Sequence, residues 1–269
     1  MEEEFIQSKQ NPRIKALSRL QERSGRRKLG LFAVEGLREL ERCLLAGVEV
    51  REIYFCADLF KSPRHSEFIT GVRGKIPLCR VSAAAFEKIS NREGCDGILG
   101  VCETWRTSLK EISIESGKPA LILIADAIEK PGNLGAMLRS ADAAGATAVI
   151  LSNPITDLFN PSVIRASQGA VFSLKIAVAT PDEIFEFLKA NKIKSCAAAL
   201  GAEKIVWDCD FTEPAAIIMG SEKDGLPRET VERCDEAVKL PMLGQADSLN
   251  VNIAAALILF EAVRQRRKI

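Results

Sequence analysis

Short apolar runs separated by polar, helix-like segments recur through the second half of this chain. The runs occupy residues 120–125, 148–151, 174–178, 195–200 and 215–219. Continuous apolar runs of this length are typical of strands buried on both faces of a parallel sheet. Helical spacing lies between them, as at 181–190, and a long apolar helix is predicted from about Leu249 to Arg267. The pattern predicts an α/β domain over residues 119–269 with a mostly parallel sheet.

The first half alternates strand and helix patterns on a smaller scale. A basic stretch at 9–28 carries Ile14, Leu17 and Leu20 at helical spacing, which predicts a short amphipathic helix. Strands are predicted at 31–34, 51–56, 76–81 and 97–103, and helices at 36–46 and 83–89. We therefore expect a smaller α/β domain over residues 1–105, and we interpret the aperiodic residues 106–118 as a linker.

Composition narrows the class of protein. The 269 residues carry a net charge of +1, which excludes a protein that coats polyanions but permits a local basic patch such as 9–28. The eight cysteines form no C-x-x-C pair, and the single histidine, His65, lies in a polar stretch that suggests a loop, so no metal site is predicted. An acidic N-terminus and the lack of a ~20-residue apolar run predict a soluble, cytoplasmic protein without membrane contact.

Three loops that follow predicted strands carry unusual residues, and ligands of open parallel sheets bind at such strand ends. The first loop runs from Glu129 to Arg139, where Asn133 is placed to cap a helix that carries Arg139. Taken alone, this segment could equally be an ordinary strand-turn-helix with a surface arginine. The second loop, Met219 to Pro227, has two glycines five residues apart and Glu222 between them. A plain loop with Glu222 in a structural pairing could have the same composition.

The third loop, 240–252, places Ser248, Asn250 and Asn252 at the head of an apolar helix. Ser248 as a helix cap would account for one of these three polar side chains and leave the two asparagines unexplained. A dinucleotide-binding enzyme would need G-x-G-x-x-G after its first strand, and the sequence has no such motif.

Together the three loops resemble the motifs of the SpoU/TrmH family of RNA ribose methyltransferases. The resemblance covers residues 118–269 and rests on asparagine and arginine six apart, on G-x-E-x-x-G and on P-M-x-G-x-x-x-S-L-N-V. The N-terminal segments 11–15 and 32–36 resemble, more weakly, a ribosomal-protein-like substrate-binding domain of the same family. Two positions depart from the family: Cys95-Asp96-Gly97 stands where relatives often have His-Gln-Gly, and Asn252 where many have serine.

The resemblance implies a parallel α/β domain with a deep trefoil knot, which breaks the usual rule against threading. It implies S-adenosylmethionine bound in a bent shape against Met219, Gly220, Leu240, Met242 and Leu249. It also implies methyl transfer to a ribose 2′-hydroxyl by a catalytic group made up of Asn133, Arg139, Glu222, Ser248 and Asn250. A guanidinium is a poor base, so we expect Arg139 to stabilise the oxyanion or an adjacent phosphate.

The family also implies partners. The expected substrate is structured RNA, ribosomal RNA in preference to transfer RNA, and the expected assembly is a homodimer whose sites use residues of both protomers. The basic N-terminal stretch is expected to contact phosphates through Arg13, Lys15, Arg26, Arg27 and Lys28. A transfer RNA methyltransferase, or a non-catalytic RNA-binding or ribosome assembly factor that kept the fold, remains an alternative.

Overall fold

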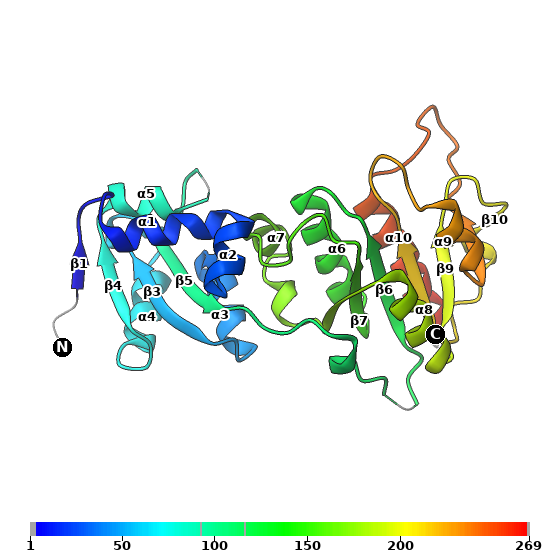
Figure 1. Ribbon diagram of the computed structural model, residues 1–269, viewed down its shortest axis with the longest axis horizontal. Helices are drawn as coiled ribbons and strands as arrows, with labels where there is room; N and C mark the ends of the chain where they lie inside the picture. Colours follow the sequence, from blue (N-terminus) through cyan, green and yellow to red (C-terminus); the bar gives the residue numbers. More distant parts are fainter. Residues whose placement is uncertain (1–3, 92, 116, 268–269) are drawn as a thin grey trace. The chain divides into compact units, whose positions relative to one another are not determined.

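The computed structural model describes residues 4–91, 93–115 and 117–267. These residues form two compact units (Figure 1), which are described separately. The first unit contains the chain up to Trp105 together with Asp157–Ser173, and the second contains Arg106–Thr156 and the chain from Leu174 onward. The sequence pattern had placed residues 157–173 in the second domain, but this segment packs with the first unit.

The described residues of the first unit form a five-stranded mixed sheet in the order β1-β4-β3-β5-β2. Strand β5 is antiparallel to both β3 and β2, whereas β1, β4 and β3 are parallel. The strands are β1 (Glu4–Ile6), β2 (Leu31–Glu35), β3 (Val50–Phe55), β4 (Leu78–Val81) and β5 (Ile98–Glu103). The helices are α1 (Pro12–Ser18), α2 (Arg23–Leu29), α3 (Leu37–Leu45), α4 (Pro63–Val72), α5 (Ala83–Ile89) and α7 (Pro161–Ala166).

Two predictions for this unit need correction. The basic stretch forms α1 and α2 with a 3₁₀ turn between them instead of one helix, and α2 ends at Gly30, which takes φ +64°. The segment around His65 is helix α4 and not a loop, with Pro63 at its first turn. Short polar helices of this kind are hard to predict because tertiary contacts, here the burial of His65 and Ile69, decide them.

The segment 157–173 belongs to the first unit because its side chains fill that unit's core. Phe159 packs 5.0 Å from the ring of Phe32 and 4.7 Å from the ring of Trp105, centroid to centroid. Asp157 forms a 2.7 Å ion pair with Arg26, whose side chain is 3% exposed. Burial of these aromatic rings, together with the buried ion pair, stabilises the packing of segment 157–173 within the first unit.

The described residues of the second unit form a seven-stranded sheet that is parallel throughout, as predicted, in the order β10-β12-β9-β11-β6-β7-β8. The strands are β6 (Leu121–Asp126), β7 (Ala148–Ser152), β8 (Ile176–Ala179), β9 (Lys194–Ala198), β10 (Lys204–Ile205), β11 (Ala215–Met219) and β12 (Glu236–Lys239). The helices are α6 (Pro131–Ala143), α8 (Pro181–Ala190), α9 (Arg228–Arg233) and α10 (Val251–Arg266). The sequence pattern missed β10 and β12, which are short, and the knot stays a prediction.

Residues 106–115 are part of the second unit and not a free linker. Ile112 is buried in its core, and Thr107 accepts a 2.9 Å backbone hydrogen bond from Val178 of β8. The central strands β6 and β11 pair in register although about 90 residues separate them in the chain. Their carboxyl ends therefore bring the first and second of the predicted loops to one edge of the sheet. Among the described residues, no helix is long and apolar enough to cross a membrane.

Candidate active site

The Glu222 carboxylate joins the first two loops at this edge. Its oxygens accept hydrogen bonds from the backbone N–H groups of Glu129, at 2.9 Å, and Lys130, at 3.0 Å. A third hydrogen bond comes from the side-chain amide of Asn133 at 2.8 Å. The second loop thus holds the beginning of α6 by three hydrogen bonds to one carboxylate, which are stronger than neutral ones.

These contacts fix the orientation of three amide groups. An ionised carboxylate can only accept, so Asn133 must turn its NH₂ group to Glu222 and its oxygen away. That oxygen accepts from the amides of Asn250, at 3.2 Å, and Asn252, at 3.1 Å. All three predicted loops are therefore linked through Asn133, whose side chain is buried.

The helix caps differ from those predicted. Lys130 is the N-cap of α6 and Pro131 its first residue, so Asn133 is free for the site instead of capping. At α10 the cap is Asn250, whose side-chain oxygen accepts a 3.0 Å bond from the Asn252 N–H. Ser248 lies two residues before this cap.

A second set of contacts holds the β6–α6 loop from its other side. The Thr156 hydroxyl donates a 2.5 Å hydrogen bond to the Glu129 carbonyl oxygen. Asn153 donates to the buried Asp126 carboxylate at 2.9 Å. Ala127 takes φ +52°, an uncommon conformation for a residue with a side chain, and its N–H donates to the Ser152 carbonyl. The backbone of the loop is therefore held on its N–H side by Glu222 and on its carbonyl side by Thr156.

The second loop turns so tightly that it requires glycine at position 220. A Cβ built on Gly220 would lie 2.2 Å from the Gly225 carbonyl carbon. Ser221 and Gly225 exchange backbone hydrogen bonds of 3.1 and 3.2 Å, and Gly225 takes φ +68°. This turn brings backbone groups to the wall of a cavity.

That cavity has a volume of about 620 Å³, within the range of small-molecule sites. The residues predicted to bind the cofactor all line it: Met219, Gly220, Leu240, Met242 and Leu249. Four of the predicted catalytic residues also line it: Asn133, Glu222, Ser248 and Asn250. Arg139 is exposed on α6 and is not among the described residues that line the cavity.

Electrostatics keep Glu222 ionised. Burial raises the pKa of its carboxyl, but the hydrogen bonds from Glu129, Asn133 and Lys130 outweigh burial, and the pKa falls below its ordinary value. At neutral pH the group is an acceptor that is already occupied by three donors. We infer that Glu222 orients Asn133 and the loop and does not take the substrate proton.

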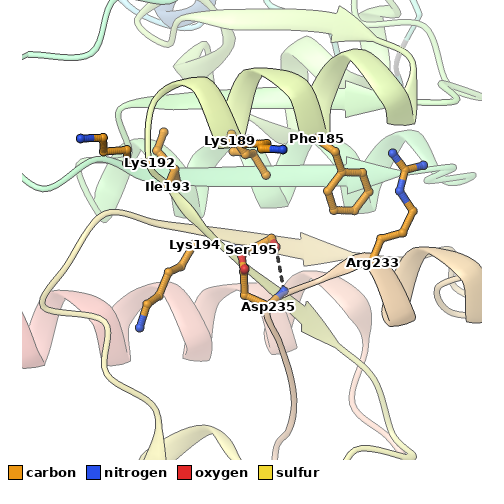
Figure 2. Close-up of a pocket in the computed structure, with 9 residues that line it drawn as sticks. Phe185, Lys189, Lys192, Ile193, Lys194, Ser195, Arg233 and Asp235 are labelled. Atoms are coloured by element: carbon orange, nitrogen blue, oxygen red, sulfur yellow. Dashed lines mark hydrogen bonds between the residues drawn. The ribbon is translucent and has the colours of Figure 1, made fainter.

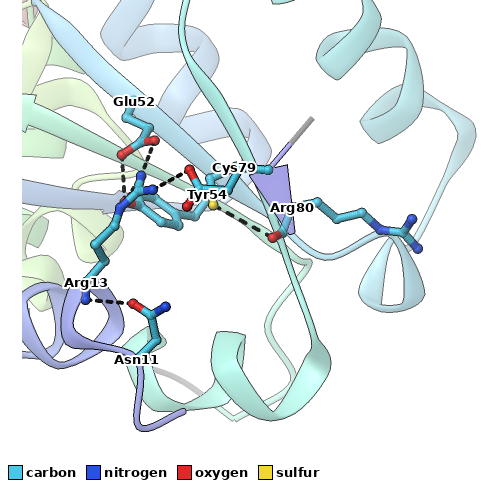
Figure 3. A network of polar contacts seen from close by, with 7 residues as sticks. Asn11, Arg13, Glu52, Tyr54, Cys79 and Arg80 are labelled. Atoms are coloured by element: carbon cyan, nitrogen blue, oxygen red, sulfur yellow. Dashed lines mark hydrogen bonds and ion pairs between the residues drawn. The ribbon is translucent and has the colours of Figure 1, made fainter. Parts of the chain in front are cut away.

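The predicted RNA-contacting residues separate into two groups. Arg26 is 2% exposed and bound to Asp157 and to the carbonyls of Leu20 and Gln21, so its assignment to phosphate binding was wrong. Arg13 is half-buried and pairs with Glu4. Figure 3 shows its contacts with Glu52 and Tyr54. The hydrogen bond to Glu52 is the main cause that holds the pKa of Arg13 above its ordinary value. Three of the predicted cations are exposed: Lys15, Arg27 and Lys28.

Sequence reasoning missed the site roles of Asn252, Thr156, Asp126 and Asn153. Asn252 was noted as an unexplained polar residue of the third loop and as a departure from the family, but it was not assigned to the site, and its amide donates to Asn133. Asp126 and Asn153 directly follow the apolar runs of β6 and β7, so their position at strand ends was the available signal. Nothing in the sequence marks Thr156, because its partner is a backbone carbonyl.

The fold and this site define a class, an RNA methyltransferase with a separate substrate-binding domain, and comparison with known proteins places the chain within it. Residues 120–260 match the model of the SpoU rRNA Methylase family, and residues 11–100 match an MRM3-like substrate binding domain. The chain belongs to the SpoU rRNA methylase family.

Relatives match nearly the full chain. It is 31% identical over 255 residues to the 23S rRNA (guanosine(2553)-2′-O)-methyltransferase RlmP of Bacillus subtilis, covering 95% of this chain and 97% of that protein. A solved RNA 2′-O ribose methyltransferase superposes with a TM-score of 0.86 at 40% identity, covering 97% and 99% of the two chains. The SpoU methyltransferase AviRb of Streptomyces viridochromogenes, in complex with AdoMet, superposes with a TM-score of 0.88 at 29% identity, covering 96% and 98%.

Proposed function

We propose that this protein transfers a methyl group from S-adenosylmethionine to a ribose 2′-hydroxyl of ribosomal RNA. The observation that carries the proposal is the Glu222–Asn133–Asn250 network at the wall of a cavity lined by all five predicted cofactor residues. The similarity of nearly the whole chain to 23S rRNA 2′-O-methyltransferases supports ribosomal RNA over transfer RNA as substrate.

The cavity suits S-adenosylmethionine on its own chemistry. Leu240, Met242 and Leu249 offer apolar surface for a ring, and the Gly220 turn offers close backbone groups for hydrogen bonds. S-adenosylmethionine, when bound, supplies an activated methyl group on a sulfonium. Glu222 and Asp224 add carboxylates to the lining, a favourable field for a cation.

The residues of this chain then have to position the 2′-hydroxyl and manage its proton. The amides of Asn133, Asn250 and Asn252 form a rigid hydrogen-bonded edge because Glu222 fixes their orientation. A guanidinium is a poor base, so we assign Arg139 to stabilising the oxyanion or a neighbouring phosphate. Ser248, exposed in the third loop, is available to contact the substrate.

We further propose that the active assembly is a homodimer. On α10 the side chains of Ile253, Leu257 and Phe260 are 48%, 41% and 46% exposed, and their spacing of four and three residues places them on one stripe. Helix α10 packs on α6, which carries Arg139 outside the cavity of its own chain. A second copy covering this stripe would bury the apolar surface and bring Arg139 to the neighbouring cavity.

Light scattering after gel filtration tests the dimer. The wild-type protein should have twice the mass of one chain, and Leu257→Glu should be monomeric and inactive. Leu45→Glu is a matched control because Leu45 is an 87% exposed leucine of the first unit. A monomeric wild type that is fully active would contradict the shared site.

In the first unit, Lys15, Arg27 and Lys28 are the exposed cations we assign to the RNA backbone. We also place the protein in the cytoplasm, since its eight cysteines are free thiols, which accords with a reducing compartment.

Isothermal titration with S-adenosylmethionine, followed by a methyl-transfer assay on 23S rRNA, tests the function. We expect one cofactor site per chain and transfer that Arg139→Lys reduces at least about 100-fold, a loss of about 3 kcal/mol of transition-state stabilisation. If the protein is a non-catalytic assembly factor, it should bind no cofactor. An Arg139→Lys protein that keeps most of the rate would exclude the role given to Arg139.

A further inference from the structure

A second cavity in the methyltransferase unit lies at the opposite edge of the sheet from the cofactor site. It has a volume of about 570 Å³ and is lined by the end of α8, the turn into β9 and the segment between α9 and β12. The cofactor site sits at the carboxyl ends of β11 and β12, whereas this cavity sits where β9 begins. Nothing in the proposed methyl-transfer chemistry uses it.

The cavity is rimmed by cations. Lys189, Lys192 and Lys194 are exposed, and no ion pair joins them to a carboxylate within the part of the chain that the structure describes. The chain as a whole carries a net charge of +1, so three such lysines within six residues make a local concentration of positive charge. Lys189 lies in the last turn of α8, where it also favours the helix dipole, but the dipole does not account for Lys192 and Lys194 beyond the helix.

The flat group in the cavity wall is the Arg233 guanidinium, which covers the face of the Phe185 ring, while Phe185 itself packs against the core of the unit. The Arg233 guanidinium carbon lies 4.2 Å from the centroid of the Phe185 ring, and Arg233 also pairs with Asp182 at 2.8 Å. Figure 2 shows Lys189 running along α8 toward Phe185, while Lys192 and Lys194 extend from the other end of the cavity. The cations therefore do not converge on one point, as a site for a single anion would require.

The one carboxylate on the lining is already occupied. Asp235 accepts hydrogen bonds from the Ser195 N–H at 2.8 Å and from the Ser195 hydroxyl at 2.7 Å. The Asp235 N–H in turn donates to the Ser195 hydroxyl oxygen at 3.0 Å (Figure 2). The Asp235 carboxylate is therefore hydrogen-bonded to the start of β9, and the exposed lysines are the charged groups that a polyanion would contact.

We propose that this cavity is a second RNA-binding site, which holds a single-stranded stretch of the substrate RNA by its phosphates and by stacking on the exposed guanidinium of Arg233. Separated cations suit a backbone with repeated charges, and a flat guanidinium can stack on any base. The inference rests on the proposed function, since it takes RNA as the substrate. It adds that the RNA reaches beyond the cofactor edge of the domain.

The test is the salt dependence of RNA affinity. The double variant Lys189→Gln/Lys192→Gln removes two cations, and Lys110→Gln/Lys118→Gln removes two exposed lysines elsewhere in the same unit. With a poly(U) oligonucleotide as the probe, losing two phosphate contacts should reduce the slope of log K against log salt concentration by about 1.4. If the variant and the wild type bind equally at 1 M salt, this difference in slope makes the variant bind about 25-fold more weakly than the wild type at 0.1 M salt. The Lys110/Lys118 control should keep the wild-type slope.

A second variant separates stacking from charge. Arg233→Lys, which keeps the charge and removes the flat guanidinium, should weaken poly(U) binding by about fivefold or more and leave the salt slope unchanged. Methyl transfer to saturating 23S rRNA should persist in all these variants. If the wild type methylates RNA but the Lys189/Lys192 variant keeps its salt slope, the second site is refuted and the proposed function stands. If the wild type transfers no methyl group to any RNA, the proposed function itself is refuted, whatever the salt slopes show.

Discussion

Replacing Asn133 by aspartate tests the network at its centre with almost no change of shape. The new carboxylate would lie at 2.8 Å from Glu222, the present hydrogen-bond distance. At an effective dielectric constant of 20, two charges at that distance repel by about 6 kcal/mol. Taking up one proton relieves the repulsion and costs about 1.4 kcal/mol per pH unit above a pKa near 4, or about 4 kcal/mol at pH 7. Because protonation costs less free energy than the repulsion of two charges, the expected loss of stability at pH 7 is about 4 kcal/mol.

The sign of the pH dependence follows from the proton count. The carboxyl pair of Asn133→Asp has a raised pKa in the folded state, so above pH 4 the folded protein binds more protons than the unfolded chain. Its stability therefore falls relative to wild type as pH rises, by up to about 1.4 kcal/mol per unit between about pH 5 and 7. Once protonated, the new side chain can donate to Glu222 as the amide does, so the variant should approach wild type near pH 4.

The assay is urea unfolding of both proteins from pH 4.5 to 8, with kcat measured at each pH where RNA is stable. Gln10→Glu is the control, because it adds a charge at an exposed position of the first unit. A stability difference that stays constant with pH would refute the reasoning, since it would show that residue 133 and Glu222 do not share a proton-sensitive contact.

Three further changes test other parts of the structure. Gly220→Ala should abolish cofactor binding, measured by titration, because its Cβ would lie 2.2 Å from the Gly225 carbonyl carbon; unchanged affinity would contradict the tight turn. Thr156→Val should lower kcat about tenfold, for the loss of a hydrogen bond worth about 1.4 kcal/mol to the Glu129 carbonyl, while Thr156→Ser restores it. Arg26→Met should lower the free energy of unfolding by about 3 kcal/mol because it strands Asp157, whereas an RNA-contact role would weaken binding and leave stability unchanged.

The sequence predicted best those elements that one local pattern defines. Apolar runs such as 120–125 are buried strands because a parallel sheet covered on both faces demands them, and the structure confirms the runs that form β6, β7 and β11. The other two runs form strands only in part, since β8 exposes Val178 and β9 ends at Ala198. The three loops meet at Asn133, as predicted, although the strand before the third loop, β12, was missed and Arg139 does not line the cavity. Asn133 was expected to cap α6, but the cap is Lys130, and the Asn133 amide instead donates to Glu222.

What the sequence could not show depends on partners that are distant along the chain. Arg26 has the same pattern as its exposed neighbours Arg27 and Lys28, and only the position of Asp157, 131 residues away, makes it a buried structural residue. The packing of 157–173 with the first unit rests on Phe159 meeting Phe32 and Trp105, a contact that no local periodicity encodes. Position after a strand predicts where a loop begins, but not which backbone carbonyl a hydroxyl such as that of Thr156 will bind.

The most direct test of the central claim is to identify the product. Purified protein would be incubated with 23S rRNA and isotopically methyl-labelled S-adenosylmethionine, and the RNA digested to nucleosides for mass spectrometry. The account predicts the label on the ribose of one nucleoside, as a 2′-O-methyl group, and its loss with Arg139→Lys. Label on a base, or no transfer from a protein that binds the cofactor, would contradict it.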